Sequence, residues 1–368
     1  IFDDREQKHL SHILALSSKR GDVPMLTTPA ASADVIFIKR DEPGAAVFLQ
    51  PARKGKLPIA PSRLGFLLTD APALERGLAI TAGQPVTFDE TWEQPWGERR
   101  FIRNHYNEWR VSYAETGGLQ RRVDVVFRLY DDGLGFRYEF PDQPALKTVR
   151  IGSEITEFNL AEDGEALWCP AWEWNREEYL YSRTPSSAVG SAQTPMTVKG
   201  RSGLHVSIHE AACIDYAGMN LRRSEETRFR AQLTPGLTNA AVVRQAPFNT
   251  PWRTLQISDS AAGLIDSSLI LNLNEPNKLG DTSWFKPHKY VGVWWEMITG
   301  KSSWSYTNDL KAIKLGDTDY TKAKPNGTHG ATTANVKKHI DFAAEHGFDG
   351  VLVEGWNVGW EDWFGNNK

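Results

Sequence analysis

The sequence is poor in features that define several large classes of protein. It has only two cysteines, Cys169 and Cys213, among 368 residues, too few for a disulfide framework or a cysteine-rich zinc site. No run of about 18 apolar residues occurs, so we expect no membrane span. The formal net charge is only −4, and no block of basic residues suggests nucleic acid as a partner. The opening IFDDREQKHL also lacks the basic and apolar segments of a signal peptide.

Aromatic residues, by contrast, are abundant and clustered. The chain has 14 Trp and 10 Tyr, and several of the tryptophans fall in segments that also carry Asp, Glu and Asn. An indole packs against the apolar face of a sugar ring, while fixed polar groups bind its hydroxyls. Large cores use tryptophan too, so packing accounts for part of this excess. The clusters on loops favour carbohydrate as the ligand.

Two regions with different patterns follow each other along the chain. Residues 1–60 give no clear signal, but from about 61 to 275 short alternating runs are separated by turn residues. That pattern predicts an antiparallel β-sandwich. The predicted strands include RLGFLLT (63–69), RVDVVFRLY (122–130), GFRYEF (135–140), GLHVSIHEA (203–211) and SLILNL (268–273). We therefore predict one β domain over 1–275, of which 1–60 is poorly assigned.

Residues 276–368 carry the pattern of a β/α unit. Residues 289–295 read as a strand, and residues 299–328 form a polar loop. A helix then begins at Thr332 or Thr333, whose side chain can cap it. Its predicted core positions recur at helical spacing: Val336, Ile340, Ala343 and Ala344.

The unit closes with a buried strand and a carboxylate at its end. The apolar run 351–353 is typical of a parallel strand covered on both faces, and Glu354 follows directly. Active sites of barrels and open α/β sheets are built at that edge. A closed (β/α)8 barrel takes roughly 250 residues, so residues 276–368 would supply only its first part. We expect the sequence to be part of a longer chain.

Several long segments resemble glycoside hydrolase family 97, the bacterial family that includes SusB-like α-glucosidases. The resemblance is carried by KYVGVWWEMITGKSSWSYTND, by KPNGTHGATTANVKKHIDFAAEHGFDGVLVEGWNVGWEDWFGN and, upstream, by VVFRLYDDGLGFRYEF and WRTLQISDSAAGLIDSSLILNLNEP. It covers roughly 61–368. It implies an N-terminal β-sandwich (super-sandwich) followed by a (β/α)8 TIM barrel. It also implies a calcium-assisted, exo-acting α-glycosidase, periplasmic or secreted.

The catalytic carboxylates of the family lie on later barrel strands, and their motifs are absent here. His209-Glu210-Ala211 is superficially similar to one of them, but it lies in the predicted β domain. Glycoside hydrolysis needs two carboxylates flanking one bond. We therefore assign no catalytic residue, and we expect this chain alone to be inactive.

Six residues near the predicted strand ends are candidates for substrate binding. The resemblance implies that Glu354 accepts hydrogen bonds from a terminal sugar, beside Trp356 and Asn357. Glu361 continues that loop, where helix capping is the alternative. Trp294 and Trp295 end the first predicted barrel strand. Neighbours on a strand point to opposite faces, so only one of the two should stack against substrate.

One residue is a candidate ligand for calcium. Glu178, in WEWNREEYLYS, lies where the family places a glutamate that reaches from the β domain to the active-site ion; Glu173 and Glu177 are alternatives. Calcium takes six to eight oxygen ligands, so one glutamate would be an incomplete site.

These observations together predict the N-terminal part of an α-glucosidase that cleaves maltooligosaccharides from the non-reducing end. An α-galactosidase of the same family is the alternative. A second alternative, from another class, is a non-catalytic carbohydrate-binding protein. Whether the enzyme retains or inverts configuration depends on residues that this sequence does not contain.

Overall fold

The computed structural model describes residues 23–27, 35–40, 47–52, 56–172, 180–303, 307 and 324–353, with side chains from residue 56 onward except at 80 and 82. The chain forms two compact units, Ile1–Lys278 and Leu279–Lys368. Among the described residues, no helix is both long and apolar enough to cross a bilayer.

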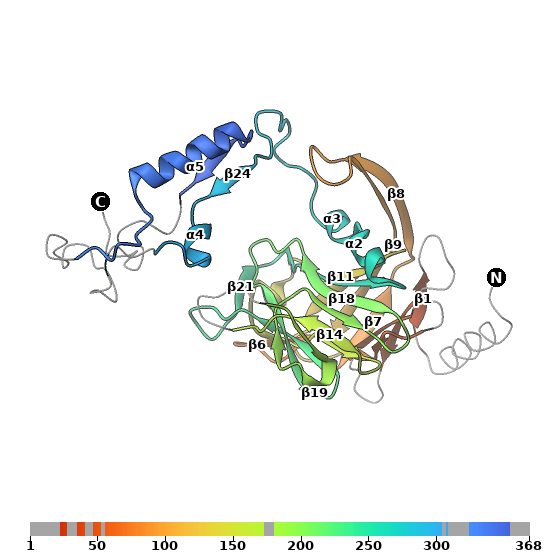
Figure 1. The fold of residues 1–368 in the computed structure, drawn as a ribbon. Helices are drawn as coiled ribbons and strands as arrows, with labels where there is room; N and C mark the ends of the chain where they lie inside the picture. The colour runs from red at the N-terminus through yellow and green to blue at the C-terminus, as the bar shows by residue number, and fades with distance from the viewer. Residues whose placement is uncertain are drawn as a thin grey trace. The chain divides into compact units, whose positions relative to one another are not determined.

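The first unit is built on one large antiparallel sheet (Figure 1). Its strands, in spatial order, are β15 (Ser182–Pro185), β14 (Glu165–Trp168), β17 (Met196–Lys199), β18 (His205–Ala211), β23 (Trp252–Ser258), β11 (Gly133–Phe140), β10 (Arg122–Tyr130), β9 (Phe101–Glu115) and β7 (Leu78–Ala82). Two more strands join its side: β22 (Phe248–Asn249) pairs with β11, and β8 (Val86–Glu93) pairs with β9.

Three smaller sheets complete the strands of this unit. A five-stranded sheet has the order β16 (Ser191–Ala192), β19 (Met219–Glu225), β20 (Arg228–Leu233), β13 (Glu157–Leu160) and β4 (Ile59–Ala60). A three-stranded sheet holds β21 (Val242–Gln245), β12 (Thr148–Glu154) and β6 (Phe66–Leu68). A four-stranded sheet holds β1 (Val23–Thr27), β2 (Val35–Arg40), β3 (Val47–Ala52) and β5 (Ser62–Arg63). Single 3-10 turns lie at Pro144–Leu146 and Ser186–Ala188.

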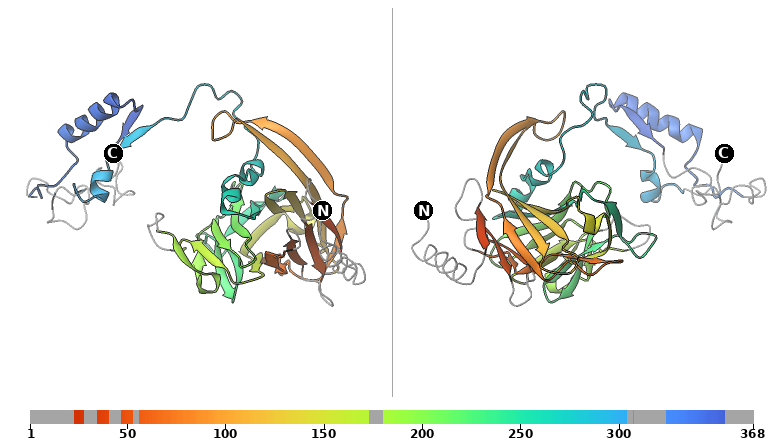
Figure 2. Two further views of the ribbon diagram at one scale, coloured as in Figure 1. Left: turned by 45° about the vertical axis from the view of Figure 1, so that its right-hand side comes forward. Right: turned by 180° about the vertical axis from the view of Figure 1, so that it is seen from behind.

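The main core contains apolar side chains of the large sheet together with those of the smaller sheets. Trp109, Phe136 and Leu255 of the large sheet belong to the same buried cluster as Phe158 and Phe229 of the five-stranded sheet. Burial of this much apolar surface is the dominant favourable contribution to folding. The prediction that this part of the chain is a domain built mostly of β-sheet is therefore confirmed (Figure 2).

A smaller buried cluster lies on the other face of the large sheet, under two short helices. Helix α2 spans Ala261–Ile265 and helix α3 spans Leu269–Asn272. Leu269 and Leu273 pack there with Trp252. The prediction of a strand over 268–273 is wrong, because these residues cover the sheet as a helical turn. The same contact explains why β10 is buried on both faces and reads as a nearly continuous apolar run.

A buried ionic cluster joins three segments of the sandwich: β12 with the residues that follow it, β18 and β23. The Arg253 guanidinium donates to both Glu154 oxygens, at 2.9 and 2.6 Å, and to Glu210 at 2.6 Å. Arg253 and Glu154 are both fully buried. Thr156 donates to Glu154 at 2.7 Å. Because a buried charge is tolerated only when it is paired and hydrogen-bonded, this cluster fixes how the sheets align.

The second unit contains the predicted strand, helix and strand. Strand β24 (Tyr290–Gly292) pairs in parallel with β25 (Gly350–Leu352). A short helix α4 (Trp295–Ile298) follows β24, and α5 (Thr333–Glu345) precedes β25. Thr332 caps α5 by accepting from the Asn335 amide at 3.2 Å. Of the four predicted core positions on α5, only Ala343 is buried. The further strands of a TIM barrel stay a prediction.

Candidate functional site

The end of strand β24 places two indole rings together. The Val293 amide donates to the Leu352 carbonyl at 3.0 Å, one residue beyond the end of β24. Trp294 has helical dihedrals and Trp295 begins α4. Their ring centroids are 4.6 Å apart and the rings are inclined by 22°. The two residues thus form one stacked pair at the carboxyl end of the strand.

This geometry corrects one prediction. Trp294 and Trp295 were expected to alternate on a strand over 289–295, but the strand ends at Gly292. The reason is local: a Cβ on Gly292 would lie only 2.7 Å from Nε1 of Trp294, so the glycine lets the indole fold back over the strand. Trp295 is 57% exposed. The pair presents an aromatic surface to solvent instead of one ring on each face.

A carboxylate missed by the sequence analysis lies directly after this pair. Glu296 accepts from the Ser302 hydroxyl at 2.6 Å and from the Asn335 side chain at 2.9 Å, and lies 3.6 Å from Nε2 of His339. The Ser302 hydrogen bond lowers the pKa of Glu296, and Asn335 and His339 lower it further. Glu296 is therefore an ionised anchor and not a proton donor at neutral pH. Asn335 and His339 are four residues apart and so lie on one face of α5, but no local pattern in the sequence links that face to Glu296.

The residues that flank the polar loop are held together beside this cluster. Ser303 lies outside the named strands and forms an isolated parallel β-bridge with His329. Its amide donates to the Thr328 carbonyl at 2.8 Å, and its hydroxyl accepts from Asn326 at 2.8 Å. Ser303 and residues 326–329 therefore lie side by side, next to Glu296 and the start of α5.

A groove of about 570 Å³ runs along β24 and α5. Tyr290, Trp295 and Phe342 give it apolar walls, and Glu296 and His339 give it polar ones. An aromatic wall with few polar groups is typical of sites for small organic ligands. The arrangement can bind and orient a ligand, but it holds one ionised carboxylate, whereas glycoside hydrolysis needs two.

Most of the predicted site residues lie outside the described residues. This applies to Glu354, Trp356, Asn357 and Glu361, and to Glu178 with its neighbours Glu173 and Glu177. Their roles stay predictions. Within the described part of the chain, no group of three or more His, Cys, Asp or Glu side chains could hold a metal ion, so calcium binding also stays a prediction.

Glu210 has a structural role, in line with its exclusion from the catalytic candidates. Its carboxylate accepts from Arg253 at 2.6 Å and from the Met219 amide at 2.9 Å. Both oxygens are therefore occupied by partners within the sandwich.

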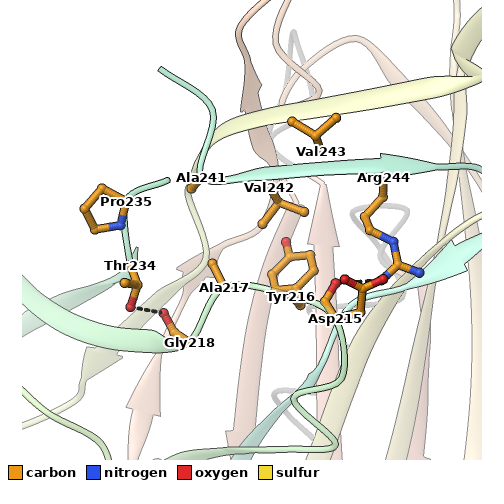
Figure 3. Close-up of a pocket in the computed structure, with 10 residues that line it drawn as sticks. All are labelled: Asp215, Tyr216, Ala217, Gly218, Thr234, Pro235, Ala241, Val242, Val243 and Arg244. Carbon is orange, nitrogen blue, oxygen red and sulfur yellow. Dashed lines mark hydrogen bonds and ion pairs between the residues drawn. The ribbon is translucent and has the colours of Figure 1, made fainter. Parts of the chain in front are cut away.

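A second hollow, of about 520 Å³, lies in the first unit between the turn 215–218 and strand β21 (Figure 3). Asp215 and Arg244 line it and pair with each other at 2.6 Å. Thr234 donates to the Gly218 carbonyl at 3.2 Å. Because its charged groups neutralise one another, we assign no ligand to this hollow.

Comparison with known proteins identifies the class of protein. The model of the glycosyl-hydrolase 97 N-terminal domain matches residues 26–276, and the model of glycoside hydrolase 97 matches residues 294–368. The chain belongs to glycoside hydrolase family 97, which confirms the resemblance.

Individual relatives refine this picture. A family 97 enzyme from Pseudoalteromonas sp. strain K8, solved in complex with acarbose, is 40% identical with a TM-score of 0.80, over 93% of this chain and 49% of that one. A probable retaining α-galactosidase of Streptomyces bingchenggensis is 25% identical over 91% of this chain and 47% of its own length. A retaining α-galactosidase of Bacteroides thetaiotaomicron is 23% identical over 83% and 46%. The chain thus spans about half the length of these relatives.

Proposed function

We propose that this chain is the N-terminal part of an exo-acting α-glucosidase of family 97. Its substrate would be a maltooligosaccharide or a similar α-glucoside, cleaved at the non-reducing end with the assistance of calcium. The location would be periplasmic or secreted. The activity belongs to the full-length protein, and we expect the 368-residue chain alone to hydrolyse nothing.

The observation that carries this proposal is the likeness to the Pseudoalteromonas enzyme. At 40% identity it is much nearer to this chain than the two relatives named α-galactosidases, at 25% and 23%. The same enzyme has been solved with acarbose and, as a variant, with the glucose trisaccharide panose. Panose is built from glucose units alone, which favours a glucoside as the substrate.

In this proposal the stacked pair Trp294–Trp295 forms an apolar platform at the strand end. A pyranose ring would lie against the exposed face of Trp295, since indole surfaces suit the apolar face of a sugar. Glu354 would accept hydrogen bonds from its hydroxyls. Glu178 would supply one oxygen ligand to calcium, whose chemistry is to polarise bound oxygen atoms.

The test is hydrolysis of 4-nitrophenyl α-D-glucoside and α-D-galactoside by the full-length protein. We expect kcat/KM to favour the glucoside at least tenfold and to fall when calcium is chelated. Glu354→Gln should lower kcat/KM for the glucoside, whereas Glu345→Gln, at the exposed end of α5, should not. A preference for the galactoside would overturn the proposed specificity.

An α-galactosidase is the second candidate, and the names of the curated relatives favour it. The galactoside arm of the same assay decides between the two. A protein that binds acarbose but hydrolyses neither substrate at full length would instead be the non-catalytic carbohydrate-binding protein.

A further inference from the structure

A cleft of about 490 Å³ lies in the first unit, where β12 passes the paired strands β19 and β20. It is lined by Ser153 of β12, by Arg222 and Ser224 of β19, and by Arg230 and Gln232 of β20. None of these residues belongs to the proposed catalytic site. Arginine side chains therefore give the cleft several positively charged hydrogen-bond donors. The register of β19 and β20 brings two of these arginines together.

Two arginines face each other across this strand pair. Arg222 is the direct partner of Arg230 in the ladder between β19 and β20, an arrangement in which like charges are destabilising. On the other side of Arg230, its partner Glu157 of β13 is already engaged by the amide of Arg63 at 3.2 Å and by its Nε at 3.7 Å. Among the described residues, no carboxylate forms an ion pair with Arg222 or Arg230.

The Arg230 guanidinium is held in place although no carboxylate of the described chain forms an ion pair with it; the nearby charges of Glu157 and Glu75 offset its burial only in part. Its Nε donates to the Glu154 carbonyl at 3.4 Å, and the side chain is half-buried. Burial, and then the charge of Arg63, lower the pKa of Arg230. Arg223 adds a further positive charge beside the cleft, with its Nε bound to the Val189 carbonyl at 2.6 Å. A partly buried cation of this kind is stabilised by an anion in the cleft.

An aromatic surface adjoins these donors. The Gln232 side-chain oxygen accepts from Nε1 of Trp172 at 3.0 Å, which leaves the amide nitrogen of Gln232 as a donor. The Trp172 side chain is 44% exposed. An exposed indole beside a set of fixed donors suits a sugar ring that carries a charged group.

We propose that this cleft is an accessory binding site for an acidic saccharide. Arg222 and Arg230 bind its carboxylate or sulfate group, Gln232 donates a further hydrogen bond, and the sugar ring lies against Trp172. The chemistry that the cleft recognises is the oxyanion, which a free inorganic anion also carries. The experiment therefore separates the two sources.

The experiment is a titration of the 368-residue chain at constant ionic strength, followed by NMR of the arginine Nε–H and tryptophan Nε1–H groups. The probes are methyl β-D-glucuronide, its neutral counterpart methyl β-D-glucoside, and sodium sulfate. We expect the uronide to bind more tightly than sulfate and to shift both Arg230 and Trp172, and the glucoside not to saturate. Sulfate binding as tightly as the uronide, with Trp172 unmoved, would overturn the saccharide and leave an anion site.

Matched variants test the residues. Arg222→Gln, at an exposed position, should keep the fold and weaken uronide binding at least tenfold, and Arg230→Gln should do the same. Trp172→Ala should weaken binding of the uronide but not of sulfate. Arg100→Gln removes an exposed arginine on the β8–β9 hairpin (Figure 1) and should change nothing. Unchanged uronide affinity in Arg222→Gln, or equal binding of the neutral glucoside, would overturn the proposal.

Discussion

The two units of this protein differ in how completely they bury the apolar residues of their elements. The first unit supplies all but two of the buried apolar side chains of the described chain; the exceptions are Val293 and Ala343. In the second unit, Tyr290, Ile298 and Phe342 are about half exposed or more. The second unit has the sequence pattern of a β/α fold, but one helix and two strands supply too few layers to cover both faces of its sheet.

The buried ionic cluster offers the largest effect by which to test this contrast. Replacing Arg253 with Met leaves Glu154 buried and uncompensated, so we expect the first unit to lose about 3–5 kcal/mol of its free energy of unfolding. Denaturant unfolding measures it. The control is Arg100→Met, which breaks an exposed pair with Glu93 and should cost less than about 1 kcal/mol. Equal losses in both variants would contradict the structural role of the cluster.

Removing one phenylalanine from each unit compares their cores directly. Phe229 is fully buried, whereas Phe342 is 48% exposed. Phe229→Ala should cost about 3–5 kcal/mol through lost burial and the cavity that remains. Phe342→Ala in the 368-residue chain should cost a small part of that. If Phe342→Ala costs as much free energy of unfolding as Phe229→Ala in the full-length protein, residues outside this 368-residue chain cover Phe342 in that protein.

The pH dependence of the second unit should follow Glu296. Because the folded-state pKa of Glu296 is lowered, its stabilising effect is complete above the ordinary glutamate pKa of about 4.3. It is lost as the pH falls through the lower folded-state value. Hydrogen exchange of the α5 amides should therefore accelerate on acidification. In Glu296→Gln this acid-dependent step should become smaller, with the part due to Asp349, whose pKa the Lys289 amide also lowers, remaining; His346→Gln, at the far end of α5, should retain the full step.

The smallest predicted effect concerns the cap of α5. Thr332→Ala removes the hydrogen bond to the Asn335 amide and should destabilise the helix by about 1 kcal/mol. Thr333→Ala is the matched control, since Thr333 lies inside the helix and does not cap it. Circular dichroism during thermal unfolding measures both, and a loss in Thr333→Ala as large as that in Thr332→Ala would contradict the assignment of the cap.

The sequence predicted the elements whose signal is local. Short apolar or alternating runs between turn residues marked β10, β11 and β18, and a threonine with a helical repeat marked α5 and its cap. It failed where a distant partner decides the conformation. Residues 268–273 alternate like a strand, but they fold as a helix because Leu273 packs onto the large sheet. Trp294 leaves the strand because Gly292 makes room for its ring, and no pattern within one element reveals such a contact.

The residues of the candidate site also fall into those that a local sequence pattern could locate and those that depend on a distant partner. The strand end and its tryptophans could be located from the apolar run and the family resemblance. Glu296 could not, because its partners Ser302 and Asn335 come from a turn and from a helix that the long polar loop separates. The arginine pair of the accessory cleft depends on strand register, since Arg222 and Arg230 become partners only once β19 and β20 are aligned.

The contact between Leu273 and Gly135 has a consequence for engineering the connection between the two units. A Cβ at Gly135 would lie 2.4 Å from Leu273, and Asn272 is bound to Trp92 at 2.9 Å and to the Arg103 carbonyl at 2.9 Å. The chain is therefore anchored to the first unit up to Asn274, well beyond its last strand. Inserted residues should be tolerated after Asn274, where doubling a flexible segment costs only about 0.6 kcal/mol of loop entropy. The same insertion between Ser260 and Leu273 would pull a helix off the sheet.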